Sequence, residues 1–354
     1  MPSQLDDYRL LGRSGLRVSP LSLGAMTFGV GGGWGSDDDD AGRMVDLYID
    51  KGGNFIDTAN FYGAGGSERV LSKLIAGRRD NLVISTKYSL TMRPGDPNAS
   101  GNHRKNMVRS VEDSLRRLET DYIDLLYLHM WDYRTPVEEI LRAFDDLARA
   151  GKILHAGISD TPAWQISRMQ AIAELRGWTP LIALQIPYSL AERTVERELM
   201  PMALEMGLGV LPWSPLAGGV LSGKYSRADL EAKKPADFGA SVTRKDINVA
   251  TGRLTERTLE IAAVVADVAG EIGVTSAQVA LAWTLLNPAV TSPLIGARTL
   301  AQLENNLAAL DVGFSDEQIA RLDAASGIEL GFPHDLLKDG PASMMFGRVK
   351  VEAR

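Results

Sequence analysis

The chain alternates between short apolar runs and longer stretches in which apolar residues recur every three or four positions. The short runs are rich in Val, Ile and Leu, which is typical of strands buried in a parallel sheet. The longer stretches have the spacing of helices that bury one face. Eight apolar runs fit the description of a strand, at residues 18–24, 53–59, 81–87, 122–129, 152–159, 181–186, 207–213 and 289–296.

Helices are expected between these strands, and several have recognisable ends. Thr135 and Thr161 each precede a proline, which is typical of an N-cap followed by Pro in the first turn, while Gly151 and Gly177 follow the last apolar positions as C-terminal stops. The acidic stretch at 36–42 lacks the spacing of a calcium loop and is better explained by helix capping. The predicted helices span residues 38–51, 67–77, 105–118, 136–150, 162–176, 192–206, 255–287 in two pieces, and 299–310.

Strands that alternate with helices predict an α/β fold with a parallel sheet, and eight such units match the (β/α)8 TIM barrel. An open doubly wound sheet is the alternative, but the chain has no G-x-G-x-x-G fingerprint and too many strands for it. We expect a single barrel domain over residues 1–354. The length beyond a minimal barrel lies in residues 1–17, in 90–102, in a long loop after strand 7 at 214–253, and in a C-terminal tail beyond 311. Residues 8–19 resemble a hairpin around Ser14 and Gly15 that plugs one end of the barrel.

Composition removes several classes of partner and of chemistry. The net charge is -7 with scattered Lys and Arg, so nucleic acid is not an expected partner. No apolar stretch approaches the roughly 18 residues of a membrane helix and the polar start is unlike a signal peptide, so we expect no membrane contact and a cytoplasmic location. The absence of cysteine excludes disulfides, thiolate nucleophiles and zinc–thiolate sites. We predict no metal site, and the sequence does not indicate an oligomeric state.

Ionisable residues stand at the ends of three consecutive strands. Asp57 ends the second run, Lys87 the third and His129 the fourth, and Tyr62 lies in the loop after the second. In a barrel the carboxyl ends of the strands converge on one face, where activity resides. Each residue alone is best explained as an ordinary loop or ion-pair residue. The four together indicate a common site, because Asp and Lys are rarely buried unless they are paired.

Proton transfer to a carbonyl oxygen is the chemistry that this set suits. A lysine ammonium at about 4 Å favours a phenolate by roughly 4 kcal/mol at an effective dielectric of 20, so Lys87 is expected to lower the pKa of Tyr62 from about 10 toward neutral pH. Asp57 would keep Lys87 charged, and His129 would orient the substrate oxygen. The sequence shows no activated nucleophile and no metal ligand cluster, so the electrons are expected to come from a hydride-donating cofactor.

At these residues the chain resembles the aldo-keto reductase superfamily, whose Asp, Tyr, Lys and His tetrad corresponds to Asp57, Tyr62, Lys87 and His129. The resemblance covers about residues 8 to 325, and its cofactor motif is similar to that of the channel-associated β-subunits and bacterial members. The motifs that carry it are "NFIDTANFYG", "SVEDSLRRLETDYIDLLYLH", "GKILHAGISD", "WSPLAGGVLSGKY" and "LIGARTLAQLENNL", in family order.

The resemblance implies an extended NADP(H) molecule across the carboxyl face of the barrel. It assigns the carboxamide to Ser159, Asp160 and Gln185, and the nicotinamide stack to Trp213. Asp160 stands where Asn is usual and Asn305 where Glu is frequent, while Arg298 suits a 2'-phosphate because its fork is bidentate. The full set that the resemblance assigns to the cofactor is Gly24, Ala25, Met26, Asp57, Ser159, Asp160, Gln185, Trp213, Ser214, Pro215, Leu216, Gly218, Lys224, Gly296, Arg298, Gln302, Asn305 and Asn306.

The leading hypothesis is therefore an NADP(H)-dependent oxidoreductase that reduces an aldehyde or ketone to an alcohol, reversibly, with Tyr62 as general acid and base. A non-catalytic NADP(H)-binding sensor subunit is the alternative, and a cofactor-free isomerase with Tyr62 as base is a third reading. Phe28, Trp34, Tyr88 and Trp131 suggest an apolar wall of the substrate pocket. Residues 343–347, "SMMFG", are either ordinary packing or a lid over the substrate.

Overall fold

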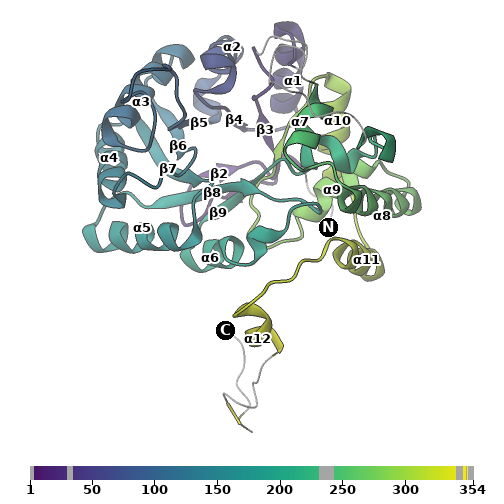
Figure 1. Ribbon diagram of the computed structural model, residues 1–354. Helices are drawn as coiled ribbons and strands as arrows, with labels where there is room; N and C mark the ends of the chain where they lie inside the picture. The colour runs from purple at the N-terminus through teal and green to yellow at the C-terminus, as the bar shows by residue number, and fades with distance from the viewer. Residues whose placement is uncertain (1–3, 30–34, 231–242, 340–345, 348, 350–354) are drawn as a thin grey trace.

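The computed structural model describes residues 4–29, 35–230, 243–339, 346–347 and 349, and in these residues the strands form one barrel surrounded by helices (Figure 1). The eight strands pair in the order β10-β3-β4-β5-β6-β7-β8-β9, and each strand is parallel to its neighbours in this order. The strands are β3 (Ser22–Gly24), β4 (Phe55–Asp57), β5 (Val83–Tyr88), β6 (Ile123–Leu128), β7 (Ile153–Ser159), β8 (Leu181–Pro187), β9 (Gly209–Trp213) and β10 (Leu294–Ile295).

The sheet closes on itself through the segment that leads into β10. The Val210 amide donates to the Ala289 carbonyl at 3.0 Å, and the Thr291 amide donates to the Val210 carbonyl at 2.8 Å. The amide of Ser22 in β3 donates to the Pro293 carbonyl at 3.0 Å. These bonds make a nearly closed (β/α)8 barrel, so the predicted fold class is confirmed and the doubly wound alternative is excluded. Each strand lies within one of the eight predicted runs or extends one residue beyond it.

Helices cover the outer face of the barrel, and a large apolar core fills the space between them and the strands. Their bounds are α1 (Asp38–Asp50), α2 (Gly66–Ile75), α3 (Arg104–Leu118), α4 (Val137–Arg149), α5 (Ala163–Arg176), α6 (Leu199–Met206), α7 (Arg244–Ala250), α8 (Glu256–Ile272), α9 (Ser276–Thr284), α10 (Leu300–Leu307), α11 (Asp316–Ser326) and α12 (His334–Asp339). None of the described helices combines the length and apolarity needed to cross a bilayer.

Several helix ends differ from the expected ones. The structure has Pro136 and Pro162 at the N-cap positions of α4 and α5, and the Thr161 hydroxyl instead donates to the Ser159 carbonyl at 2.8 Å. Asp37 caps α1 as the acidic stretch predicted, since its carboxylate accepts from the Asp40 amide at 2.7 Å. The expected helix at 192–206 begins only at Leu199, after a short 3-10 turn.

The predicted hairpin plugs the amino end of the barrel. β1 (Arg9–Leu10) and β2 (Arg17–Val18) pair antiparallel, and the fully buried side chains of Leu11 and Val18 join a cluster inside the barrel with Phe55 and Tyr127. Because this end is filled with apolar side chains, the opposite, carboxyl end is the one that can take a ligand.

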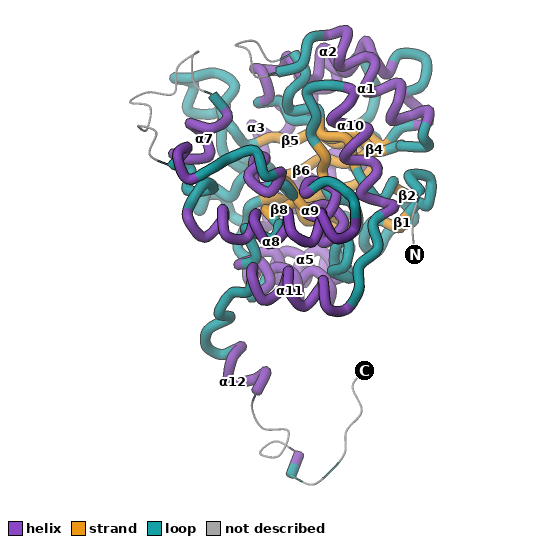
Figure 2. The backbone as a smooth tube through the Cα atoms, turned by 90° about the vertical axis from the view of Figure 1, so that its right-hand side faces the viewer, coloured by secondary structure: helices purple, strands orange, loops and turns teal. Residues whose placement is uncertain are grey.

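The described part of the C-terminal tail, through α12, does not cover the carboxyl face. After α11 it runs past the start of α6, where the Arg197 guanidinium donates to the Glu329 carbonyl at 2.8 Å and His334 contacts Glu198 at 2.8 Å. From there α12 points away from the barrel in both views (Figures 1 and 2). Of the lid expected at 343–347, residues 343–345 lie outside the described residues.

The hairpin plug depends on a glycine whose backbone lies against the barrel. Gly12 has a φ of 55°, and a Cβ there would lie 2.2 Å from the Ile182 carbonyl oxygen. Gly12→Ala is therefore expected to lower the free energy of unfolding by about 1–3 kcal/mol or more through steric clash and backbone strain. Gly15→Ala on the same hairpin is the matched control, since a Cβ at Gly15 meets nothing within 4 Å. Equal urea unfolding midpoints for the two variants would contradict this account of the plug.

Candidate active site

A cavity of about 850 Å³ opens at the carboxyl ends of the strands. β3, β4, β7, β9 and β10 each contribute a terminal residue to its wall, including Gly24, Asp57 and Trp213, and β8 contributes Gln185, which lies two residues before its end. The remaining wall comes from the loops after the strands and from residues of α7, α9 and α10. The cavity thus lies where a barrel places its ligand-binding loops.

The four predicted catalytic residues come together at the inner end of this cavity. Parallel register sets Asp57 of β4 beside Ser85 of β5, and Lys87 lies one pleat further along β5. Lys87 Nζ lies 5.0 Å from the centre of the Tyr62 ring, and the rings of Tyr62 and His129 meet edge to face at 5.8 Å. Asp57, Tyr62 and His129 line the cavity, while Lys87 lies behind them.

Lys87 and Asp57 form an ion pair that is closed off from solvent. The Lys87 side chain has no exposed surface and that of Asp57 is 2% exposed, with 2.5 Å between Nζ and Oδ2. Lys87 Nζ also donates to the Thr58 carbonyl at 2.8 Å. Asp57 Oδ1 accepts from the Ser85 hydroxyl at 2.6 Å and from Gln185 Nε2 at 3.0 Å. Both charges therefore have the additional hydrogen bonds that a buried pair requires.

The pKa of Tyr62 in the structure corrects one expectation from the sequence. Burial raises the pKa of Tyr62 above its usual value, and the opposing attraction of Lys87 does not outweigh it. The expected lowering of the Tyr62 pKa is therefore wrong for this structure, because desolvation of the phenolate was left out of the Coulomb estimate. Burial alone would lower the pKa of Lys87, but Asp57 and Tyr62 reverse this and raise it. Tyr62 is protonated and Lys87 is charged at neutral pH.

His129 is held in its neutral form. Burial, followed by the nearby charge of Lys87, lowers the pKa of His129 to about 3. Its backbone amide donates to the Tyr88 carbonyl at 3.0 Å, which continues the β5–β6 ladder and fixes the ring at the strand end. The Nδ1 atom is buried and has no hydrogen-bond partner within the described residues. A neutral imidazole here can hydrogen-bond a substrate oxygen without adding a charge.

A ring-stacking surface follows the tetrad along the cavity. Trp213 ends β9, and its indole nitrogen donates to Asp160 Oδ1 at 3.1 Å. Burial raises the pKa of Asp160, and the hydrogen bond from Trp213 opposes that rise. Ser159 and Gln185 pair as neighbours at the ends of β7 and β8. Together these residues place one apolar ring and several hydrogen-bonding groups on the same stretch of wall.

The outer end of the cavity is cationic. Lys224, Arg244, Arg253 and Arg298 line it, and the acids that line the whole cavity in the described chain are Asp57 and Asp160, both at the inner end. Burial and then the charges of Arg298 and Arg244 lower the pKa of Lys224, which shows that the cations repel one another. An anionic group bound here would offset both the burial of the Lys224 charge and the repulsion among the cations.

Most residues that the resemblance assigned to the cofactor line this cavity. Ala25 does not, because it is buried in the core and its carbonyl accepts from the Ser67 hydroxyl at 2.6 Å. Those that line it are Gly24, Met26, Asp57, Ser159, Asp160, Gln185, Trp213, Ser214, Pro215, Leu216, Gly218, Lys224, Gly296, Arg298, Gln302, Asn305 and Asn306.

Three of the four residues named for the aromatic substrate wall do not line the cavity. Phe28 and Tyr88 are fully buried in the core, where the Tyr88 hydroxyl donates to the Asn102 carbonyl at 3.0 Å, and Trp131 is buried outside the cavity lining. Trp34 lies outside the described residues. The apolar wall beside the tetrad is made instead by Phe61, which is 46% exposed, and by Leu90.

Sequence reasoning also missed two cations. Arg244 begins α7 and Arg253 follows it, both inside the segment that was expected to be an irregular loop. The Arg253 guanidinium lies 5.5 Å from the centre of the Trp213 ring. The signal that would have found them is "TRKD", since Thr243 and Asp246 form a capping box.

The profile of the Aldo/keto reductase family matches residues 20–326. The chain is 38% identical over 353 residues to the norsolorinic acid reductase stcV of Emericella nidulans, with 96% of this chain and 87% of that protein covered. It is 39% identical over 330 residues to the uncharacterized oxidoreductase YrpG of Bacillus subtilis, covering 89% and 94% of the two chains. It is 35% identical over 360 residues to an aryl-alcohol dehydrogenase [NADP(+)] of Phanerodontia chrysosporium, covering 96% and 91%.

The low pKa of His129 makes stability depend on pH in a defined window. His129 takes up a proton below about pH 6.5 in the unfolded chain, but only near pH 3 in the folded chain. Below pH 6.5 this residue therefore lowers the free energy of unfolding by about 1.4 kcal/mol per pH unit. His129→Asn removes that contribution. We expect the free energy of unfolding in urea to fall less between pH 6.5 and 5.5 for the variant than for the wild type. Identical slopes would show that His129 is not held neutral.

Proposed function

This chain belongs to the aldo/keto reductase family, and from that premise we propose that it reduces an aldehyde or ketone to the corresponding alcohol with NADPH, in a reversible reaction. The observation that carries the proposal is the buried Lys87–Asp57 pair behind Tyr62, with His129 beside the phenol at the end of a large cavity. A sensor subunit that only binds the nucleotide has no need for a buried charge pair directed at a phenol.

Tyr62 is proposed to protonate the substrate oxygen during reduction. Because burial raises its pKa, the phenol carries its proton at neutral pH and is ready to act as an acid. The charge of Lys87 becomes most valuable as the proton leaves, since it then stabilises the phenolate in a site with little water. NADPH, when bound, supplies the hydride.

The other two residues are proposed to prepare this proton transfer. Asp57 keeps Lys87 protonated and holds it toward the phenol, with Ser85 and Gln185 fixing the carboxylate. His129 is neutral, so it offers a hydrogen bond to the substrate oxygen without competing with Lys87 as a charge. In the oxidation direction the same groups act in reverse, with Tyr62 as the base.

The cavity wall fits NADP(H) in three sections. Trp213 suits the nicotinamide ring, and Ser159 and Gln185 suit its carboxamide. Asp160 can accept from the carboxamide NH₂ through one oxygen while the other accepts from Trp213. The turn after Ser214, in which Ala217, Gly218 and Gly219 have positive φ, gives the pyrophosphate a close approach to the backbone.

The cationic outer end suits the phosphate on the adenosine ribose. Arg298 and Arg244 line it together with Lys224, and their mutual repulsion favours a dianionic group between them. Asn305 stands close by, with its Oδ1 accepting from the Thr275 hydroxyl at 3.1 Å. These cations support NADPH rather than NADH as the preferred donor.

We propose aromatic or other apolar carbonyl compounds as substrates. Phe61 and Leu90 form an apolar wall next to the tetrad, and two of the similar proteins are a norsolorinic acid reductase and an aryl-alcohol dehydrogenase by name. Charged sugars would leave polar groups unpaired against this wall.

Removing the phenolic proton tests the catalytic assignment. Tyr62→Phe is expected to slow NADPH oxidation with an aromatic aldehyde by on the order of 10²-fold or more, since general acid catalysis contributes about that much. NADPH affinity, measured by quenching of tryptophan fluorescence, is expected to stay within a few-fold. Tyr133→Phe is the matched control, because Tyr133 is 68% exposed and lies outside the cavity lining.

Two results would overturn the assignment. A Tyr62→Phe variant that keeps more than a tenth of the wild-type rate would show that another group donates the proton. Wild-type protein that binds NADPH but turns over none of a panel of reactive aldehydes and ketones would favour the sensor function instead.

The cofactor preference is tested at Arg298. A charged, bidentate contact to a phosphate contributes about 1.5–3 kcal/mol, so Arg298→Gln is expected to weaken NADPH binding by about 10- to 100-fold. NADH binding is expected to change little, because NADH lacks the 2'-phosphate. Arg227→Gln is a control on an exposed arginine that pairs with Glu256 at 2.8 Å. Parallel losses of NADPH and NADH affinity would contradict the role of Arg298.

A further inference from the structure

Asp160 brings a negative charge to the large cavity that no cation of the described residues pairs with. Two acids line this cavity in the described chain, Asp57 and Asp160. Asp57 is paired with Lys87 at 2.5 Å, whereas Asp160 makes no ion pair within the described residues. Asp160 directly follows β7, and its side chain is partly exposed in the cavity. A ligand in the cavity can therefore come into contact with this charge.

The backbone and two hydrogen bonds fix Asp160 against the ring-stacking surface. Its φ is 40°, in the left-handed region, and its carbonyl accepts from the Trp131 amide at 3.4 Å. Trp213 Nε1 donates to Asp160 Oδ1 at 3.1 Å, and the Ser159 side chain also hydrogen-bonds the carboxylate. The charge of Asp160 is thus held at the edge of the indole that suits the nicotinamide ring.

These structural contacts do not require a carboxylate. An asparagine would accept the same bond from Trp213 through its amide oxygen, and Asn tolerates a positive φ better than most residues. A carboxylate has a desolvation cost in addition, since burial raises the pKa of Asp160. The two hydrogen bonds and the attraction of Lys87 oppose this rise and favour the ionised form. Asp160 therefore carries a charge that its contacts within the protein do not explain.

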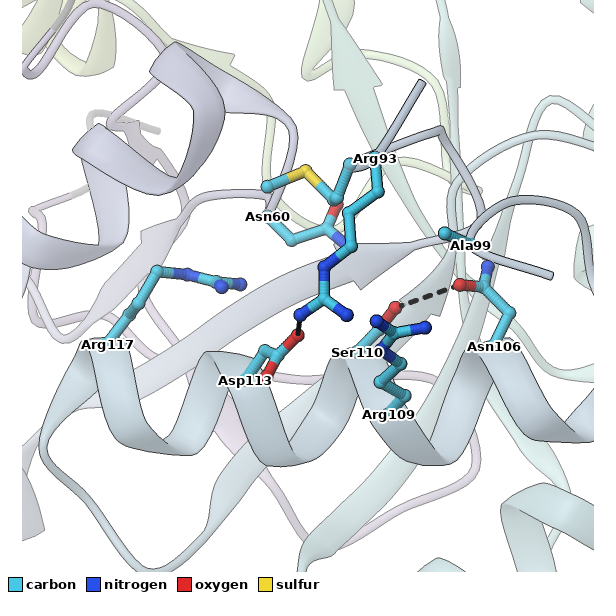
Figure 3. A pocket seen from close by; sticks show the side chains of 9 residues that line it. Asn60, Arg93, Ala99, Asn106, Arg109, Ser110, Asp113 and Arg117 are labelled. Atoms are coloured by element: carbon cyan, nitrogen blue, oxygen red, sulfur yellow. Dashed lines mark hydrogen bonds and ion pairs between the residues drawn. The ribbon is translucent and has the colours of Figure 1, made fainter. Parts of the chain in front are cut away.

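A second acid at a hollow of the chain shows how such a charge is compensated elsewhere. Asp113 lines a small pocket between α3 and the loop at 90–102, where its Oδ2 contacts Arg93 Nη2 at 3.3 Å (Figure 3). No cation of the described residues lies at such a distance from Asp160, and Lys87, which attracts it, is already paired with another acid. The partner of Asp160 is therefore expected to be a positive charge on a ligand in the large cavity.

We propose that Asp160 shifts the cofactor preference of the cavity toward NADP+ over NADPH, an inference that rests on the proposed function. The nicotinamide ring is uncharged in NADPH and positively charged in NADP+, so a fixed negative charge beside the ring-stacking surface favours the oxidised form. Lys87 acts in the opposite sense, as does Arg253, whose guanidinium lies 5.5 Å from the centre of the Trp213 ring. Asp160 offsets these two positive charges.

The same preference assists carbonyl reduction. The hydride carries two electrons to the carbonyl carbon, Tyr62 gives its proton to the oxygen, and NADPH becomes NADP+ with a positive ring. Asp160 stabilises that charge as it develops. By linkage, the factor by which Asp160 favours NADP+ over NADPH is also the factor by which it strengthens bound NADPH as a hydride donor.

The inference is tested by calorimetric titration of NADP+ and of NADPH into the wild type and Asp160→Asn, without substrate. The variant keeps an acceptor for Trp213 and loses only the charge, so it is expected to fold. We expect the ratio of the Kd for NADP+ to the Kd for NADPH to rise by about 10-fold. At an effective dielectric of about 20, a unit charge within roughly 10 Å contributes at least that much.

Asp46→Asn is the matched control, because it makes the same chemical change at a side chain on α1 that is 58% exposed and lies outside the cavity lining. Its ratio is expected to equal that of the wild type. A ratio for Asp160→Asn within about two-fold of the wild-type ratio would overturn this inference and leave the proposed function intact. Wild-type protein that binds neither NADP+ nor NADPH would overturn the proposed function and this inference with it.

Discussion

The buried ion pair between Lys87 and Asp57 is the constraint on which the candidate active site depends. Two charges without solvent contact carry a large desolvation cost, and they are tolerated only where their remaining donors and acceptors are satisfied. Ser85, Gln185 and the Thr58 carbonyl do this from three strands or strand ends. Closure of the sheet brings those strands around the pair. The barrel is thus the means by which a lysine is held charged beside a phenol in a nearly dry site.

The distribution of polarity along the barrel axis follows from the same constraint. The amino end is closed by an apolar hairpin, and the large cavity of the described residues opens at the carboxyl end. There the charge changes along the cavity, from the ion pair of Lys87 and Asp57 at the inner end to a group of four cations at the outer end. A long, anionic cofactor with an uncharged reactive ring matches that gradient. Burial keeps Tyr62 protonated and His129 neutral, which leaves Lys87 as the positive charge next to the phenol.

The sequence predicted the strands, and the meeting of Asp57, Tyr62, Lys87 and His129 at one rim, because each rests on a local signal. Apolar runs of the right length mark strands, and parallel strands in register bring residues such as Asp57 and Lys87 together at one rim. Properties set by tertiary surroundings were not predictable in this way. The pKa of Tyr62 moves opposite to the expected direction, because its desolvation depends on packing that no spacing reveals. Phe28 and Tyr88 are core residues for the same reason, since an aromatic residue near a strand end can point to either side of the sheet.

The most direct test of this account is a double-mutant cycle on the buried pair, with the rate of NADPH oxidation by an aromatic aldehyde as the readout. Wild type, Asp57→Asn, Lys87→Met and the double variant are compared under identical conditions. If the pair acts as one unit on Tyr62, each single variant loses most of the rate and the double variant is no slower than the slower single variant. If the two losses multiply, or if either single variant keeps the wild-type rate, Lys87 and Asp57 do not act as one unit on Tyr62 and the central claim is wrong.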